Sequence, residues 1–154
     1  MFRLIYALIP VLLITTPSIG QQSLVGTYKI ISGTNEVDGR PYELKGKSLQ
    51  GYLVLTPTRL ICFYTGENRK FGTSDADKAT LLDSLTGYAG VYRVEGDKLI
   101  YTTEVIWTES GKGTTRVERW ELSGNRLTLT VGPMPFPRDP SKTMIRRQVW
   151  EKIE

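Results

Sequence analysis

A stretch near the middle of the chain alternates between apolar and polar residues on both sides of a two-residue turn. It reads YAGVYRVEGDKLIYTTEVIW, with Gly96–Asp97 at its centre. Gly-Asp between two alternating runs is typical of a tight β-hairpin, because the favoured two-residue turns need positive φ angles. The pattern therefore predicts two antiparallel strands between Tyr88 and Trp107.

The short turn fixes the register of this hairpin and gives it two chemically different faces. In this register Gly90 would face Thr103, and Tyr88 would face Val105. The uncharged face consists of Tyr88, Gly90, Tyr92, Val94, Leu99, Tyr101, Thr103, Val105 and Trp107. We assign this face to the interior. Its aromatic and hydroxyl groups, with the small Gly90 leaving a gap, favour a cavity over a close-packed sandwich core.

Further strand patterns lie on both sides of the hairpin. The additional strands are expected over residues 24–32, 49–56, 60–65, 114–123, 126–131 and 143–153. A short helix is expected over residues 76–85, where Ser74 can cap the first turn. Residues 33–47 are expected to form a polar loop, and the Pro-rich residues 132–142 to lie outside strand interiors. The pattern predicts an all-β fold, an eight-stranded antiparallel up-and-down barrel with one short helix; a β-sandwich is the alternative.

A second hairpin, across Gly124–Asn125, supports the assignment of inward faces. Its apolar face consists of Trp120, Leu122, Leu127 and Leu129. Arg116 and Glu118 lie on the same face, farther from the turn. Buried charges need partners, so we expect these two side chains to pair with each other or with a ligand.

Length and composition narrow the range of functions. A chain of 154 residues argues for one domain. It has no histidine, which excludes Ser-His-Asp and Cys-His catalysis and the usual zinc ligands, so neither a metal nor a cofactor is expected. Cys62, the only cysteine, is expected to be a buried apolar residue. The formal charge of +4 comes mostly from scattered basic residues, which gives no reason to expect a nucleic-acid partner.

The first 20 residues have the pattern of a secretory signal peptide. Arg3 supplies a positive start, Leu4–Ile14 is apolar, and Ser18 and Gly20 place small residues at the cleavage-site positions. We therefore expect residues 1–20 to be removed and residues 21–154 to form the barrel of an exported, periplasmic or secreted protein. The apolar run is shorter than the about 20 residues of a transmembrane helix, so no stable membrane insertion is expected after cleavage. An uncleaved anchor is the alternative.

Four motifs stand in a particular order along the chain. They are Leu24–Tyr28 (LVGTY), Tyr88–Tyr92 (YAGVY) with Gly96–Asp97, Arg119–Leu129 (RWELSGNRLTL) and Val149–Glu151 (VWE). Together they resemble the bacterial and fungal lipocalin-like domain family, and the resemblance implies a lipocalin-like β-barrel over nearly all of residues 21–154. Some fungal members of that family are linked to cyclisation or isomerisation of natural-product intermediates. Relatives often carry His where this chain has Tyr101 and Thr102, and many have Arg where it has Glu118, so the resemblance implies no His-dependent chemistry here.

The candidate ligand-binding residues are inward-facing and aromatic, hydroxyl-bearing or charged. They are Tyr88, Tyr92, Tyr101, Thr103, Arg116 and Glu118. They favour a small apolar or amphipathic ligand inside the barrel, with a polar group that the tyrosines would hydrogen-bond. A cofactor-independent isomerase or cyclase that uses Glu118, Arg116 and tyrosines is one alternative, and a structural domain with a filled barrel is another. Binding is favoured over catalysis, so no residue is assigned as catalytic, and the sequence identifies neither the ligand nor the oligomeric state.

Two further expectations concern the closure and the mouth of the barrel. Arg146–Arg147 would supply an arginine that closes the barrel against Tyr28, which is a structural role. The loops at 33–47 and 132–142 would gate the mouth, with Phe136 as a lid residue; tolerated surface insertions are the alternative.

Overall fold

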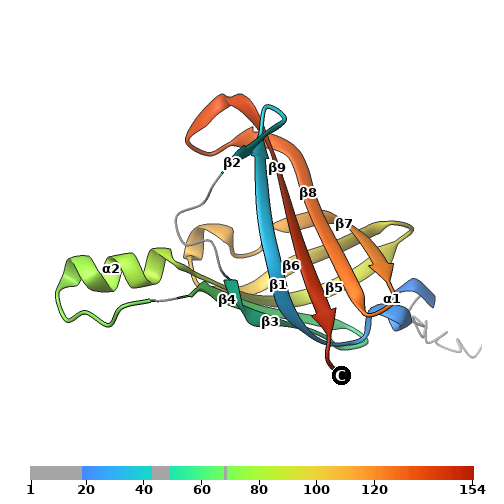
Figure 1. Cartoon of the computed structure of the whole chain (residues 1–154). Coiled ribbons are helices and arrows are strands. Elements are labelled where there is room, and N and C mark those ends of the chain that lie inside the picture. Colours follow the sequence, from blue (N-terminus) through green and yellow to red (C-terminus); the bar gives the residue numbers. More distant parts are fainter. Residues whose placement is uncertain (1–18, 43–48, 68) are drawn as a thin grey trace, which may run out of the picture.

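The strands close into one antiparallel barrel. The computed structural model describes residues 19–42, 49–67 and 69–154. Its strands are β1 (Gly26–Val37), β2 (Arg40–Tyr42), β3 (Leu49–Leu55), β4 (Arg59–Gly66), β5 (Leu85–Glu95), β6 (Lys98–Ile106), β7 (Thr115–Ser123), β8 (Arg126–Phe136) and β9 (Asp139–Lys152). Its helices are α1 (Ile19–Leu24), α2 (Asp75–Asp83) and the 3₁₀ turn η1 (Glu109–Gly111). Short β2 flanks β1, while the other eight strands follow one another around the barrel and β9 pairs with β1 to close it (Figure 1).

The predicted eight-stranded up-and-down barrel is therefore confirmed, and so is the short helix. Ser74 caps α2, because its Oγ accepts a hydrogen bond from the amide of Asp77 at 3.1 Å. Most of the predicted signal peptide, residues 1–18, and part of the predicted polar loop, residues 43–48, lie outside the described residues. Within the described ranges, no helix has the length and apolar character needed to cross a bilayer.

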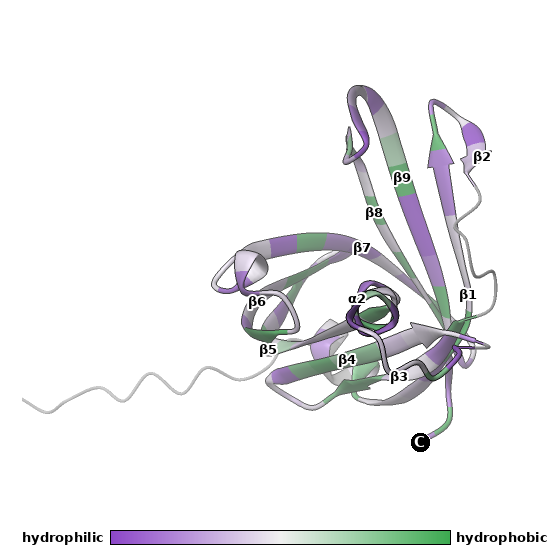
Figure 2. Ribbon diagram, turned by 90° about the vertical axis from the view of Figure 1, so that its left-hand side faces the viewer, coloured by the Kyte–Doolittle hydropathy of each residue, from purple (hydrophilic) through white to green (hydrophobic). Residues whose placement is uncertain are grey.

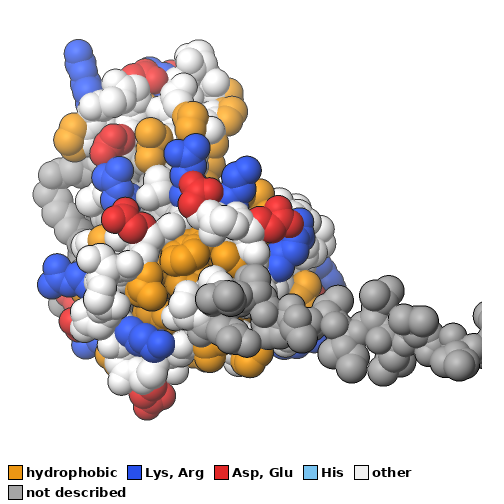
Figure 3. Space-filling view, turned by 90° about the vertical axis from the view of Figure 1, so that its right-hand side faces the viewer, with side chains coloured by type: hydrophobic (Ala, Val, Ile, Leu, Met, Phe, Trp, Pro, Cys, Tyr) orange, Lys and Arg blue, Asp and Glu red, His pale blue; other side chains and the backbone are white. Residues whose placement is uncertain are grey.

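One end of the barrel is closed by α1 and filled with apolar side chains. Leu24 at the end of α1 is fully buried and its carbonyl accepts a hydrogen bond from the Tyr28 hydroxyl at 2.9 Å. Gln21 is also buried, and its Nε2 donates to the carbonyl of Pro57 at 2.6 Å and to that of Tyr92 at 3.3 Å. Figure 3 shows this side of the molecule, where hydrophobic side chains gather in the middle of the face. These contacts make Gln21 and Leu24 part of the barrel fold.

The β5–β6 hairpin forms across Gly96–Asp97 as predicted, but its register changes away from the turn. A β-bulge between Ala89 and Gly90 brings Tyr88 opposite Ile106. The prediction that Tyr88 faces Val105 is wrong for this reason. Val105 turns outward and is 66% exposed, while Ile106 packs against the core.

The space at Gly90 is filled by the neighbouring strand. Gly90 does face Thr103, as predicted. A Cβ at Gly90, however, would collide with the carbonyl oxygen of Thr102 on β6. The glycine therefore permits a close approach of two backbones and leaves no gap, which corrects the interpretation drawn from its size.

The Pro-rich residues 132–142 are mostly strand, contrary to the prediction. β8 and β9 continue past the barrel as a ribbon, and β1 runs alongside β9 as far as Val37 (Figure 2). β8 pairs with β7 only as far as Thr130, so beyond it the edge of β8 away from β9 has no partner strand in the described parts of the chain. Register shifts around Pro133 and Pro135 also interrupt the regular pairing of β8 with β9. A proline is tolerated at such an edge because its missing N–H interrupts no pairing there.

The predicted polar loop at 33–47 is also partly strand. β1 continues to Val37 alongside β9, and β2 returns after the turn at Asp38–Gly39. Asp38 fixes this turn to the ribbon, because its Oδ1 accepts a hydrogen bond from the amide of Thr143 at 2.9 Å. The polar side chains of this segment lie on paired strands beyond the barrel core, where alternation with buried apolar residues is not required.

Candidate functional site

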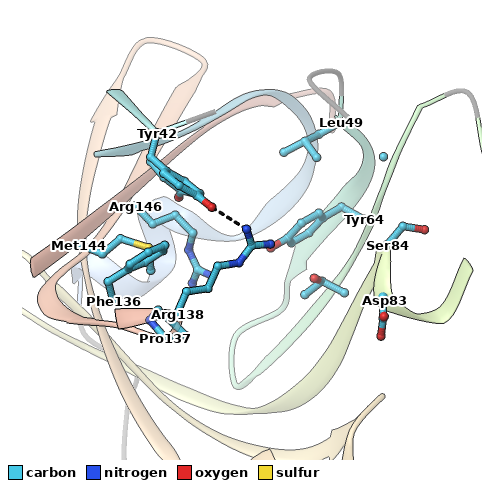
Figure 4. A pocket seen from close by; sticks show the side chains of 13 residues that line it. Tyr42, Leu49, Tyr64, Asp83, Ser84, Phe136, Pro137, Arg138, Met144 and Arg146 are labelled. Carbon is cyan, nitrogen blue, oxygen red and sulfur yellow. Dashed lines mark hydrogen bonds between the residues drawn. The ribbon is translucent and has the colours of Figure 1, made fainter. Parts of the chain in front are cut away.

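A pocket of about 370 Å³ opens at the end of the barrel opposite α1. The residues that face it from the barrel strands are Asn35, Leu49, Tyr64, Gly66, Thr86, Met144 and Arg146. Tyr42, Phe136 and Arg138 extend its wall beyond the barrel (Figure 4). The site therefore combines an aliphatic and aromatic lining with two guanidinium groups.

Strand periodicity explains why β9 contributes to both the pocket and the core. Alternate residues of a strand point to the same face, so Met144, Arg146, Gln148 and Trp150 all point inward. Met144 and Arg146 line the pocket. Gln148 and Trp150 are 4% and 0% exposed and lie deeper in the barrel. Trp150 packs edge-on against Tyr64, with ring centroids 6.1 Å apart.

The outer wall is held together by aromatic contacts between β2 and the β8–β9 ribbon. The rings of Tyr42 and Phe136 meet edge to face, with centroids 5.0 Å apart. Nη1 of Arg138 donates a hydrogen bond to the Tyr42 hydroxyl at 2.8 Å, as drawn in Figure 4. The Arg138 guanidinium also lies 6.0 Å from the centroid of the Tyr42 ring. Phe136, expected as a lid residue, is part of this wall.

A row of polar groups crosses the barrel interior behind the pocket. Nη2 of Arg146 lies 3.7 Å from Oε1 of Glu118, and the Tyr101 hydroxyl donates to the same oxygen at 2.8 Å. The Tyr88 hydroxyl follows 3.5 Å from that of Tyr101, and their rings are stacked with centroids 5.5 Å apart. Cys62 lies next to Tyr88. We call these five residues the polar belt.

Burial decides the charge states within the polar belt. It raises the pKa of Cys62 to about 12 and raises that of Tyr88 well above the usual value. Burial and the neighbouring Glu118 together raise the pKa of Tyr101. Burial acts to lower the pKa of Arg146, but the neighbouring Tyr64 and Glu118 outweigh it and the net shift is upward. At neutral pH the thiol of Cys62 and the phenols of Tyr88 and Tyr101 are therefore uncharged, and Arg146 carries a positive charge.

Three buried side-chain atoms in the described part of the chain have no hydrogen-bond partner. They are Oε2 of Glu118, Nε of Arg146 and Nε1 of Trp150. An unsatisfied buried polar atom costs about 1–3 kcal/mol, and such atoms call for a physical explanation. The atoms of Glu118 and Arg146 belong to the polar belt, and Arg146 also lines the pocket.

Three of the predicted binding residues come together in the polar belt. Tyr88, Tyr101 and Glu118 lie directly behind Arg146. Arg116 is close to them, with its guanidinium 6.0 Å from the centroid of the Tyr88 ring. The expected alternative of an Arg116–Glu118 pair does not occur, because Glu118 pairs with Arg146.

The other two predicted residues lie apart from this group. The hydroxyl of Thr103 donates to the carbonyl of Gly111 at 2.5 Å and anchors η1. Tyr92 lies at the closed end, where its hydroxyl donates to the carbonyl of Thr56 at 2.8 Å. None of the six predicted residues is part of the pocket lining, so their role as direct ligand contacts stays a prediction.

Arg146 is the site residue that the sequence reasoning misplaced. The cation next to the Tyr28 ring is Lys152, with Nζ 5.9 Å from the centroid, and Arg147 pairs with Glu36 at 3.7 Å. The expectation that an arginine of Arg146–Arg147 closes the barrel against Tyr28 is therefore wrong. Strand alternation from Trp150 would have placed Arg146 on the inward face.

The described residues contain no group of three or more His, Cys, Asp or Glu side chains arranged to hold a metal ion. A family model described as a lipocalin-like domain matches residues 25–153 of the chain. No curated protein matches the chain significantly.

Proposed function

Because the chain belongs to the lipocalin-like domain family, we propose that it is an exported binding protein for a small amphipathic molecule. The ligand occupies the pocket at the open end of the barrel. Eight-stranded barrels of this kind have an interior just wide enough for side chains or for one small ligand. In this chain side chains fill the end closed by α1, and the ligand would occupy the other end.

The pocket carries this proposal. Its volume of about 370 Å³ lies within the range of about 300–1,000 Å³ typical of small-molecule sites. Leu49, Phe136 and Met144 offer apolar surface, and Arg138 and Arg146 offer donors. A few polar groups in an otherwise apolar lining are the usual composition of a ligand pocket.

A structural domain with a filled barrel is the weaker alternative, because only the closed half of the barrel is filled. A cofactor-independent isomerase or cyclase is favoured by one observation, the unpartnered Oε2 of the buried Glu118. Glu118 lies behind Arg146, however, and does not line the pocket. Catalysis would require Glu118→Gln to abolish turnover of a bound substrate while leaving its affinity intact.

Binding is tested by filling the pocket. Thr86 faces it from β5, whereas Thr34 is exposed on β1. The mature protein is incubated with a lipid extract, co-purifying molecules are identified by mass spectrometry, and their affinity is measured by displacement of a neutral fluorescent dye. Thr86→Trp should weaken binding at least tenfold, and Thr34→Trp should leave it unchanged. The proposal fails when no molecule co-purifies, or when both variants bind as the wild type does.

Export is supported by the signal-peptide pattern of residues 1–20, and the fold is compatible with cleavage after Gly20. Cleavage after Gly20 retains Gln21 and Leu24, which seal the closed end. Intact-mass analysis of protein from the extracytoplasmic fraction should give a chain that starts at Gln21. Accumulation of the full 154-residue chain in the cytoplasm would show that the pattern is misleading.

A further inference from the structure

Two arginines from different segments direct their guanidinium groups into the same pocket. Arg146 comes from β9, and Arg138 from the turn that joins β8 to β9 (Figure 4). Both are fixed by neighbours, Arg146 by Glu118 and Arg138 by the hydroxyl and ring of Tyr42. Fixed guanidinium groups lose less side-chain entropy when they bind a ligand.

The two arginines of the pocket differ in their ion pairs. Glu118 compensates Arg146 from behind. Among the described residues, no carboxylate forms an ion pair with Arg138, and the only acidic residue of the lining is the exposed Asp83 near the end of α2. Arg138 is thus left without an ion-pair partner in the described part of the chain, and an anionic head group would supply one.

The unpartnered Nε of Arg146 indicates where such an anion would bind. Arg146 already uses Nη2 toward Glu118, but its Nε–H is buried and donates to no acceptor among the described residues. The edge of a guanidinium is a fork of N–H donors that matches a carboxylate in geometry and charge. An anionic oxygen at this position would satisfy the donor that the protein leaves unpaired.

We propose that the pocket selects amphipathic carboxylates, with the carboxylate between Arg146 and Arg138 and the apolar tail against Leu49, Phe136 and Met144. This inference rests on the proposed function, because it assigns the ligand class of the same pocket. Its basis is the convergence of two fixed arginines and the unpartnered Nε in an apolar lining.

The test compares three probes with a ten-carbon chain, counting the carboxyl carbon of the first, that differ in the head group: decanoate, decanol and decyltrimethylammonium. Their affinities for the mature protein are measured by calorimetry. Decanoate should bind at least tenfold more tightly than decanol, and the cation should bind most weakly. Arg138→Met should remove most of the preference for decanoate over decanol.

Arg126→Met is the matched control, because Arg126 is exposed on β8 and the net charge changes equally. Arg146→Lys keeps the charge but removes Nε, and it should also reduce the preference for decanoate. Equal affinities for the three probes would overturn the carboxylate assignment and leave a pocket that binds by its apolar wall. An equal loss in Arg138→Met and Arg126→Met would reveal a general charge effect and overturn it too. If no probe binds and Thr86→Trp alters no ligand's affinity, the proposed function fails with it.

Discussion

Glu118→Gln should lower the free energy of unfolding by about 2 kcal/mol. Glu118 is only 2% exposed, and its Oε1 interacts with both Arg146 and Tyr101. Glutamine keeps a carbonyl acceptor for the Tyr101 hydroxyl but loses the charge that compensates Arg146. Removing one partner of a fully buried ion pair costs about 3–5 kcal/mol. The Arg146 side chain is 27% exposed at the pocket, so solvent screens the remaining charge and the expected cost is smaller.

The reverse change should cost more. Arg146→Met leaves the carboxylate of Glu118 uncompensated in a site that solvent barely reaches, so the full cost of about 3–5 kcal/mol is expected. The double variant Glu118→Gln/Arg146→Met leaves no uncompensated charge. It should therefore be more stable than the sum of the single effects predicts, by about 2 kcal/mol.

Urea unfolding followed by tryptophan fluorescence measures these values, since the chain has three tryptophans. The control is the exposed pair of Arg59 and Glu104, whose side chains are 57% and 45% exposed. Glu104→Gln should cost less than about 1 kcal/mol. The reasoning is refuted if Glu118→Gln costs no more than Glu104→Gln, or if the effects at Glu118 and Arg146 are additive.

Two further predictions concern the barrel interior. Burial raises the pKa of Cys62 from 9.0 to about 12, so above pH 9 the unfolded chain releases this thiol proton and the folded protein does not. The contribution of the neutral thiol to stability is full below pH 9 and declines as the pH rises toward 12. Wild-type protein should therefore lose about 2 kcal/mol more of its free energy of unfolding between about pH 7.5 and 10.5 than Cys62→Ala does. If urea unfolding gives the same loss for both proteins, the raised pKa of Cys62 is contradicted. Gly90→Ala should destabilise the barrel by about 2–3 kcal/mol, because the new Cβ meets the carbonyl of Thr102. Gly66→Ala is the matched control, since a Cβ there meets nothing within 4 Å, and equal unfolding midpoints for the two variants would disprove the close approach.

The barrel could be predicted because its information is local. Alternation and the turn at Gly96–Asp97 determine the β5–β6 pairing near the turn. The eight barrel strands form seven pairings in chain order, so only the pairing of β9 with β1, which closes the barrel, remains to be inferred. The bulge at Ala89–Gly90 could not be predicted, because a bulge depends on how two backbones approach each other. Its effect is large, since it turns Val105 to the outside and removes the gap that Gly90 suggested.

The pocket was harder to predict because its walls extend beyond the regular barrel. Tyr42, Phe136 and Arg138 lie in segments whose polar residues and prolines favoured loops. Their strand pairing depends on partners distant in sequence, such as Asp38 with Thr143. The alternation that correctly predicts a buried Glu118 also places Arg146 on the inward face. The wrong prediction for Arg146 was its role, because it was expected to contact Tyr28.

The position of the polar belt connects the two halves of the barrel. A buried ion pair contributes little more to stability than apolar residues of the same volume would, so stability alone does not explain Glu118 and Arg146. The pocket supplies a reason, because Arg146 lines it and has an unpaired Nε among the described residues, while Glu118 holds its guanidinium from behind and Tyr101 holds Glu118. The packing below the belt supports this arrangement, since Cys62, Tyr88 and Tyr101 belong to the same buried cluster as Trp150. The packed closed end thus positions the charged Arg146 at the base of the pocket in the open end. Selective binding of an anionic head group requires this arrangement.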